Sequence, residues 1–160
     1  MPESKIKNAT RAGNAWLELE TICRKIHVQL YDTGDIAPAM RYRARLQKVL
    51  GELPKNDLAI LREEGLALLH EMQGEITQAI THRRKEIRLI ERLHKSVEQS
   101  ITNGDYDATM GKSILAGRTA GILMQRRTIL AALQQKRDSS KRIDVVNIVR
   151  PRAAANRRIG

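Results

Sequence analysis

The triplet Gly111-Lys112-Ser113 is the stretch of the chain that most resembles a phosphate-binding loop. Such a loop needs a glycine, four residues and then Gly-Lys-Ser or Gly-Lys-Thr, and it follows a buried strand. Six residues separate Gly104 from Gly111, and the residues before Asn103 have helical periodicity. We therefore expect no nucleotide site here, because the backbone N–H groups of the triplet are needed inside a helix.

Histidine, cysteine and carboxylate side chains show no spacing typical of a metal or catalytic site. His70, His82 and His94 are spaced by twelve residues, so each is rotated by about 120° from the last and the three cannot share one helix face. Glu91 and His94 have the Glu-x-x-His spacing of di-iron bundles, but a second such motif is absent. Cys23 is the only cysteine, which excludes a disulfide within the chain. We expect no metal, no cofactor and no enzymatic activity.

The composition favours a core built between helices. The chain has 160 residues, no Phe, one Trp and three Tyr, so aliphatic side chains must supply the buried area that aromatic residues usually provide. The net charge of +11 favours anionic partners such as nucleic acid or acidic proteins. No apolar run approaches the roughly 20 residues that span a bilayer, and the first residues lack the apolar region of a secretory signal. We expect a cytoplasmic protein.

Apolar residues recur at intervals of three and four through most of the chain, which predicts an all-α fold without a sheet. Residues 1–13 are polar and are expected to be flexible, and residues 14–136 are expected to form the helical domain. A first helix should begin at Asn14 and end at Asp32-Thr33-Gly34, where the glycine can adopt the left-handed conformation. A second helix should begin near Asp35 or Ile36 and end before Pro54.

The apolar pattern between Asp57 and Ile101 predicts one long, coiled-coil-like helix of nearly 70 Å at about 1.5 Å per residue. Gly65 and Gly74 could mark a bend in it or a close contact with another helix. A final helix should run over residues 107–136. The short link between these two helices predicts an antiparallel hairpin.

Residues 137–160 are expected to form a basic, flexible tail. The segment from residue 136 to the end contains eight Lys or Arg and two Asp, so more than half of the net charge lies there. Its apolar island at residues 143–149 predicts either a strand-like docking segment or a segment that folds back on the bundle. Together with a basic patch at residues 83–95, the tail is the candidate anion-binding surface, whose residues are Arg83, Arg84, Lys85, Arg88, Arg92, Lys141, Arg142, Arg150, Arg152, Arg157 and Arg158.

The segment from Leu46 to Ile101 consists of a leucine-rich helix, a break, and a long helix that starts with Arg-Glu-Glu and has a basic second half. This arrangement, with the later stretch GRTAGILMQRRTILAAL, resembles flagellar export chaperones of the FlgN type. The resemblance implies a small helical protein of the cytoplasm that binds C-terminal helical segments of export substrates. The strong positive charge and the arginine-rich C-terminal segment depart from that family's pattern.

Three functional hypotheses follow. The first is a non-enzymatic adaptor or chaperone that binds an amphipathic helix of another protein in an open apolar seam. The second is a basic helical protein that binds nucleic acid through residues 83–95 and the tail. The third is a homo-oligomer built on the long helix. For the first, the candidate partner-binding residues are Leu115, Ile122, Ile129 and Leu133, with Ile87 and Ile90 facing them; alternatively these residues form the core of the chain itself.

Overall fold

The computed structural model describes residues 2–54, 59–103 and 109–155 of the chain. These residues form helices and their connections, and no strand occurs among them, which confirms the all-α prediction. In chain order the elements are α1 (Pro2–His27), the short π-helical segment η1 (Val28–Asp32), α2 (Ile36–Met40), α3 (Arg43–Glu52), α4 (Ala59–Met72), α5 (Ile76–Thr102) and α6 (Thr109–Ala155).

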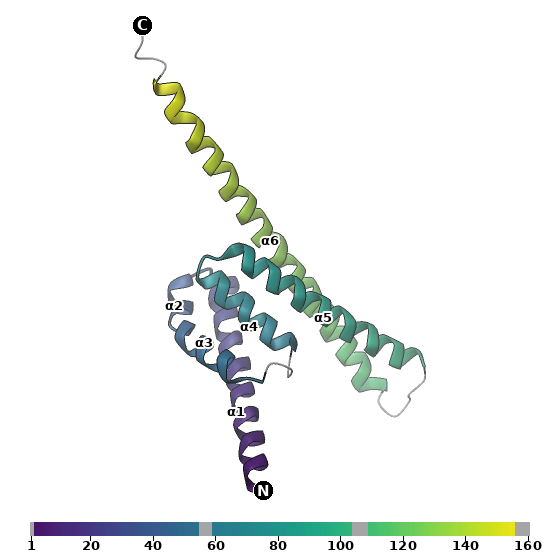
Figure 1. The fold of residues 1–160 in the computed structure, drawn as a ribbon. Helices are drawn as coiled ribbons and strands as arrows, with labels where there is room; N and C mark the ends of the chain where they lie inside the picture. Colours follow the sequence, from purple (N-terminus) through teal and green to yellow (C-terminus); the bar gives the residue numbers. More distant parts are fainter. Residues whose placement is uncertain (1, 55–58, 104–108, 156–160) are drawn as a thin grey trace.

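The helices form a bundle from which a two-helix arm extends. Helices α1 to α4 pack together, and α5 leaves this bundle alongside the first half of α6, which runs in the opposite direction (Figure 1). The N-terminal part of α1 and the C-terminal part of α6 extend away from the body at opposite ends (Figure 1). The molecule therefore has two apolar cores, one inside the bundle and one along the contact between α5 and α6.

The core of the bundle is built from the apolar stripe predicted for the first helix. Leu19, Ile22 and Ile26 of α1 are buried at intervals of three and four, as the periodicity requires. They pack with Leu46 of α3 and Leu68 of α4, both of which are fully buried. Each such side chain contributes about 1.5–3 kcal/mol by leaving water, which holds three helices together without an aromatic core.

The local signals at residues 32–54 correctly place the two outer helix boundaries of this region. Gly34 has a φ of 70°, the left-handed conformation predicted to end the first helical segment. The Asp35 side chain accepts a hydrogen bond of 3.0 Å from the backbone N–H of Ala37 and so caps α2. Leu53 is extended because it precedes Pro54, and α3 ends before it. The single helix predicted here is instead two, because a turn at residues 41–42 separates α2 from α3.

The prediction of one long helix between Asp57 and Ile101 is wrong, because the chain reverses direction at Gly74. This residue has a φ of 76°, which a side chain would disfavour, and it separates α4 from α5. The two helices pack against each other as a hairpin (Figure 1). Gly65 has the other role considered for it, a close helix contact. A Cβ atom at Gly65 would lie 3.0 Å from Leu50 Cδ2 of α3 and 3.3 Å from Leu19 Cδ1 of α1.

Both ends of the chain are more helical than predicted. Helix α1 begins at Pro2, so residues 2–13 are helical where a flexible segment was expected, and Asn14 is not a cap. Proline is compatible with a first helical turn, and no further proline interrupts α1. At the other end, α6 continues through the expected tail to Ala155. The apolar island at residues 143–149 is thus helical and not strand-like, and Ile143 is exposed.

Candidate functional site

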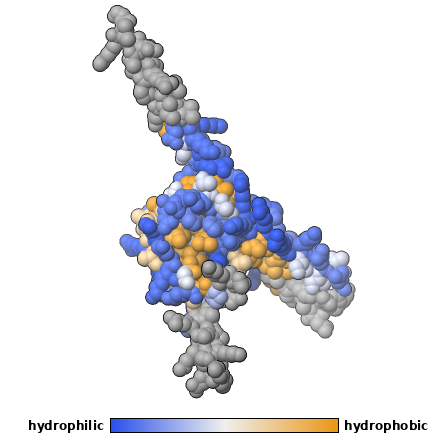
Figure 2. Space-filling view, in the orientation of Figure 1, coloured by the Kyte–Doolittle hydropathy of each residue, from blue (hydrophilic) through white to orange (hydrophobic). Residues whose placement is uncertain are grey.

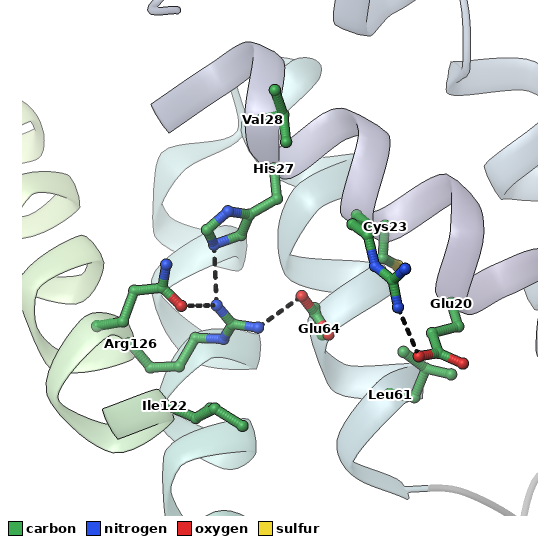
Figure 3. A pocket seen from close by; sticks show the side chains of 10 residues that line it. Glu20, Cys23, His27, Val28, Leu61, Glu64, Ile122 and Arg126 are labelled. Atoms are coloured by element: carbon green, nitrogen blue, oxygen red, sulfur yellow. Dashed lines mark hydrogen bonds and ion pairs between the residues drawn. The ribbon is translucent and has the colours of Figure 1, made fainter. Parts of the chain in front are cut away.

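A buried network of charged side chains joins the bundle to the arm. Its centre is Arg126 of α6, which reaches between His27 of α1 and Glu64 of α4 (Figure 3). Arg126 donates through Nη2 to Glu64 Oε1 over 2.7 Å and through Nε to Glu86 Oε1 over 2.7 Å. Its Nη1 donates to His27 Nε2 over 2.9 Å and to Gln125 Oε1 over 3.0 Å. One guanidinium thus connects α1, α4, α5 and α6.

The second arginine of the network is Arg83, whose side chain is fully buried. Arg83 donates through Nη1 to Glu86 Oε2, one turn further along α5. Its Nη2 lies 3.5 Å from the hydroxyl of Tyr31, which in turn donates to Glu71. Burial alone would lower the pKa of Arg83, but the adjacent carboxylate of Glu86 raises it above its ordinary value. Arg83 therefore stays charged in the protein interior.

A cavity of about 340 Å³ lies beside Arg126. It is lined by residues of α1, α4 and α6, including Cys23, His27 and Glu64 (Figure 3). Burial raises the pKa of the Cys23 thiol, and the nearby carboxylates of Glu64 and Glu86 raise it further. Because the nucleophile of cysteine is its thiolate, the cavity does not provide an activated cysteine. The network holds the helices in place and offers no group poised for covalent catalysis.

His27 is the titratable group of the network whose pKa is shifted most clearly within the accessible pH range. Burial lowers its pKa to about 4, and the positive charges of Arg126 and Arg83 act in the same direction. The Nε2 atom of His27 accepts a hydrogen bond from Arg126, which requires this nitrogen to be unprotonated. His27 is therefore a neutral acceptor at neutral pH.

Acidification is expected to destabilise the protein through His27. The unfolded chain binds a proton on His27 below about pH 6.5, whereas the folded protein does not until about pH 4, so the free energy of unfolding falls as pH decreases through this window. Because His27 is half-buried, we expect a discounted loss of about 1 kcal/mol between pH 7 and pH 5. Urea titrations of the wild type and of His27→Gln at several pH values would measure it. Glu64, whose pKa is raised, acts in the opposite direction but is present in both proteins; parallel pH dependences would contradict the assignment.

The structure places most of the predicted partner-binding residues in the core of the arm and not at the surface. Ile129 and Leu133 are buried with Ile80 of α5, and Ile87 and Ile90 are buried with Leu123 of α6. These four residues form the core of the arm, which fits the alternative that they pack within the chain itself. Ile122 is different, because it is 40% exposed and lines the cavity beside Arg126. The side chain of Leu115 lies outside the described residues.

Two apolar hollows lie along α6. The predicted residues Ile129 and Leu133 line the first of them, whereas sequence reasoning did not single out Met124. The first, of about 680 Å³, lies between α6 and the η1 region and is lined by Leu30, Tyr31 and Leu133 among others. The second, of about 580 Å³, lies on the side of α6 that faces His94 of α5. Met124 and Thr128 line both hollows. Met124 is 71% exposed, the largest exposed fraction among the large apolar residues that the structure describes. We call the two hollows and Met124 the α6 groove.

The predicted anion-binding residues separate into buried and exposed groups. Arg83 belongs to the buried network, so assigning it to a surface patch is wrong. Arg83 instead pairs with Glu86, one turn further along the same helix. The exposed members are Arg84, Lys85, Arg88 and Arg92 of α5 and Lys141 and Arg142 of α6. The side chains of Arg150, Arg152, Arg157 and Arg158 lie outside the described residues.

The described residues hold no group of three or more His, Cys, Asp or Glu placed to bind a metal ion. In the same residues no helix combines the length and the apolar character needed to cross a bilayer. Comparisons with protein-family models, with curated proteins and with solved structures gave no match to this chain. The surfaces of the protein itself therefore carry the information about its function.

Proposed function

We propose that the protein is a non-enzymatic helical adaptor that binds an amphipathic helix of another protein along the α6 groove. The observation that carries the proposal is the position of Met124, an exposed apolar side chain on a ridge between two apolar hollows. Methionine is flexible and polarizable, and it is common on surfaces that accept different apolar side chains. A partner helix could place apolar side chains in the hollows on either side of this ridge.

The dimensions of the groove suit a helix. Its lining residues extend along α6 from Ala120 to Lys136, which at about 1.5 Å per residue is about 24 Å, or more than four helical turns. Gly121 lies at the edge of the groove, and a Cβ atom there would meet nothing within 4 Å. Small residues at this edge leave room for a second backbone to approach α6. Anchors at positions i, i+3, i+4 and i+7 of a partner helix would then reach both hollows.

A narrower form of the proposal follows from the resemblance to export chaperones of the FlgN type. In that form the partner helix is the C-terminal segment of a protein destined for export. The α6 helix contains ten Lys or Arg and two Asp, so an acidic partner helix would be favoured over a basic one. A second copy of this chain would be an alternative occupant, and sedimentation at several concentrations distinguishes it from a heterologous partner.

Site-specific crosslinking tests the proposal. A photoreactive amino acid at position 124 should yield an adduct with a helical segment of a partner in cell extract, and mass spectrometry should identify that segment. The matched control is position 17, because Leu17 is also an exposed apolar residue, 57% exposed, but lies on α1 outside the groove. Equal adducts at both positions would contradict a specific groove.

The Met124→Glu variant should then weaken binding of the identified segment by at least about tenfold, because a carboxylate would have to be desolvated between the hollows. Met124 is exposed, so the fold should survive, and an unchanged circular-dichroism spectrum would verify it. Ile129 would be a poor choice for the same test, since it is buried in the arm. Binding that is unchanged in Met124→Glu would place the partner elsewhere.

A further inference from the structure

Helix α5 carries a row of exposed cations on the side that faces solvent. Arg84, Arg88, Arg92 and Lys95 are spaced by four, four and three residues, so they lie within an arc of about 80° on the helix. Lys85 lies at the edge of the same arc. All five are exposed, and Figure 2 shows hydrophilic residues along the length of α5. We call these five residues the α5 basic row.

The α5 basic row has no partner among the described residues. None of its members forms an ion pair or a side-chain hydrogen bond there. The carboxylates of α5 are used elsewhere: Glu86 pairs with the two buried arginines, Glu91 with Arg127 and Glu98 with His94. Like charges at i and i+4 destabilise a helix by about 0.2–0.5 kcal/mol per pair. A bound polyanion would remove this repulsion.

The residues around the α5 basic row indicate which class of polyanion it can bind. Binding of unpaired bases needs aromatic side chains for stacking, but the aromatic residues that the structure describes, Trp16, Tyr31 and Tyr42, lie outside α5 and are partly buried. Insertion into a lipid surface needs an open apolar face, yet most apolar side chains of α5 are buried or partly buried, and Leu93 is the only large one exposed among those the structure describes on this helix. A duplex requires neither feature, since its phosphates lie on the outside.

We infer that the α5 basic row binds the phosphate backbone of duplex nucleic acid without reading its sequence. The four cations from Arg84 to Lys95 are separated by 11 helical steps, or about 16 Å, which matches about five base-pair steps at 3.4 Å each. Arginine forms bidentate hydrogen bonds with phosphate oxygens, and three of the four residues in the line are arginines. Because α5 packs between α4 and α6, the row is held straight before binding. This site is separate from the α6 groove and does not depend on it.

Fluorescence anisotropy with a labelled 20-base-pair DNA duplex, measured over a range of salt concentrations, tests the inference. The variant is Arg84→Gln/Arg88→Gln/Arg92→Gln in the full chain. It should lower the slope of log K against log salt by about three and weaken binding at 0.1 M salt by at least about 30-fold. A 20-base-pair RNA duplex of the same sequence shows whether the row binds the phosphate backbone of DNA, of RNA or of both.

Two triple variants with the same change of charge serve as controls. Arg41→Gln/Arg43→Gln/Lys48→Gln removes exposed, unpaired cations of the α2–α3 region, and Lys136→Gln/Lys141→Gln/Arg142→Gln removes exposed cations of α6. Both should stay within about threefold of the wild type. An equal loss in either control would show that net charge alone drives binding and would overturn the inference. So would unchanged binding in the α5 variant, or stronger binding to single-stranded poly(dT) or to vesicles with 30% phosphatidylserine.

Discussion

Glu86→Gln is expected to lower the free energy of unfolding by about 3–5 kcal/mol, a large part of the roughly 5–15 kcal/mol available to a domain of this size. Glu86 is fully buried and accepts hydrogen bonds from both Arg83 and Arg126. The variant keeps the size of the side chain but leaves two buried guanidinium groups with the carboxylate of Glu64 as the remaining close counter-charge. Urea unfolding followed by circular dichroism would measure the loss.

Glu91→Gln is the matched control for this prediction. Glu91 also lies on α5 and pairs with Arg127 of α6 over 2.9 Å, but both side chains are exposed. Exposed pairs contribute about 0–1 kcal/mol, so this variant should stay close to the wild type. If the two variants lost equal stability, the network would not be the electrostatic support of the fold that its geometry indicates.

Gly65→Leu is expected to destabilise the protein by about 3 kcal/mol, because it inserts a side chain where α4 crosses α1 and α3. The first added carbon would already lie within 3.0 Å of Leu50 Cδ2 and 3.3 Å of Leu19 Cδ1. Leu19 is fully buried, so it has little room to move away. Thermal unfolding of the variant should show a lower midpoint than the wild type, with an unchanged far-ultraviolet spectrum at low temperature.

Gly51→Leu provides the comparison for that variant. Gly51 is also helical, but a Cβ atom there would meet nothing within 4 Å, and leucine is a better helix former than glycine by up to about 1 kcal/mol. This variant should therefore be neutral or slightly stabilising. Gly65→Leu with the stability of the wild type would show that the three helices can separate without loss, contrary to the observed packing.

Short-range signals in the sequence were sufficient for the helical class and for several boundaries. The stripe from Leu19 to Ile26 and the breaks at Gly34 and Pro54 depend only on neighbouring residues, and the structure confirms them. The reversal at Gly74 was not predictable with the same certainty, because a helix with an interior glycine and a hairpin with a glycine turn have similar apolar periodicity. Packing of α4 against α5 decides between them.

The site was less predictable, because it depends on which faces are covered. Periodicity marked Ile87, Ile129 and Leu133 as apolar, but it could not tell whether they bind a partner or each other. The periodicity also grouped Arg83 with the exposed cations, although Arg83 lies on the buried side of α5. The i, i+3 spacing of Arg83 and Glu86 was the available signal for the buried pair. Nothing local linked that pair to Arg126, 40 residues away.

The contacts of Arg126 also affect how the protein unfolds. His27 and Arg126 are 99 positions apart, so their contact closes more than half of the chain into one loop. Separating α6 from the bundle would break the hydrogen bonds that Arg126 donates to Glu64 and His27. Unfolding of either core alone would leave polar and charged side chains of this network without their partners. We therefore expect the bundle and the arm to unfold in a single cooperative transition, and Tyr31, which packs against the apolar clusters of both, supports this expectation.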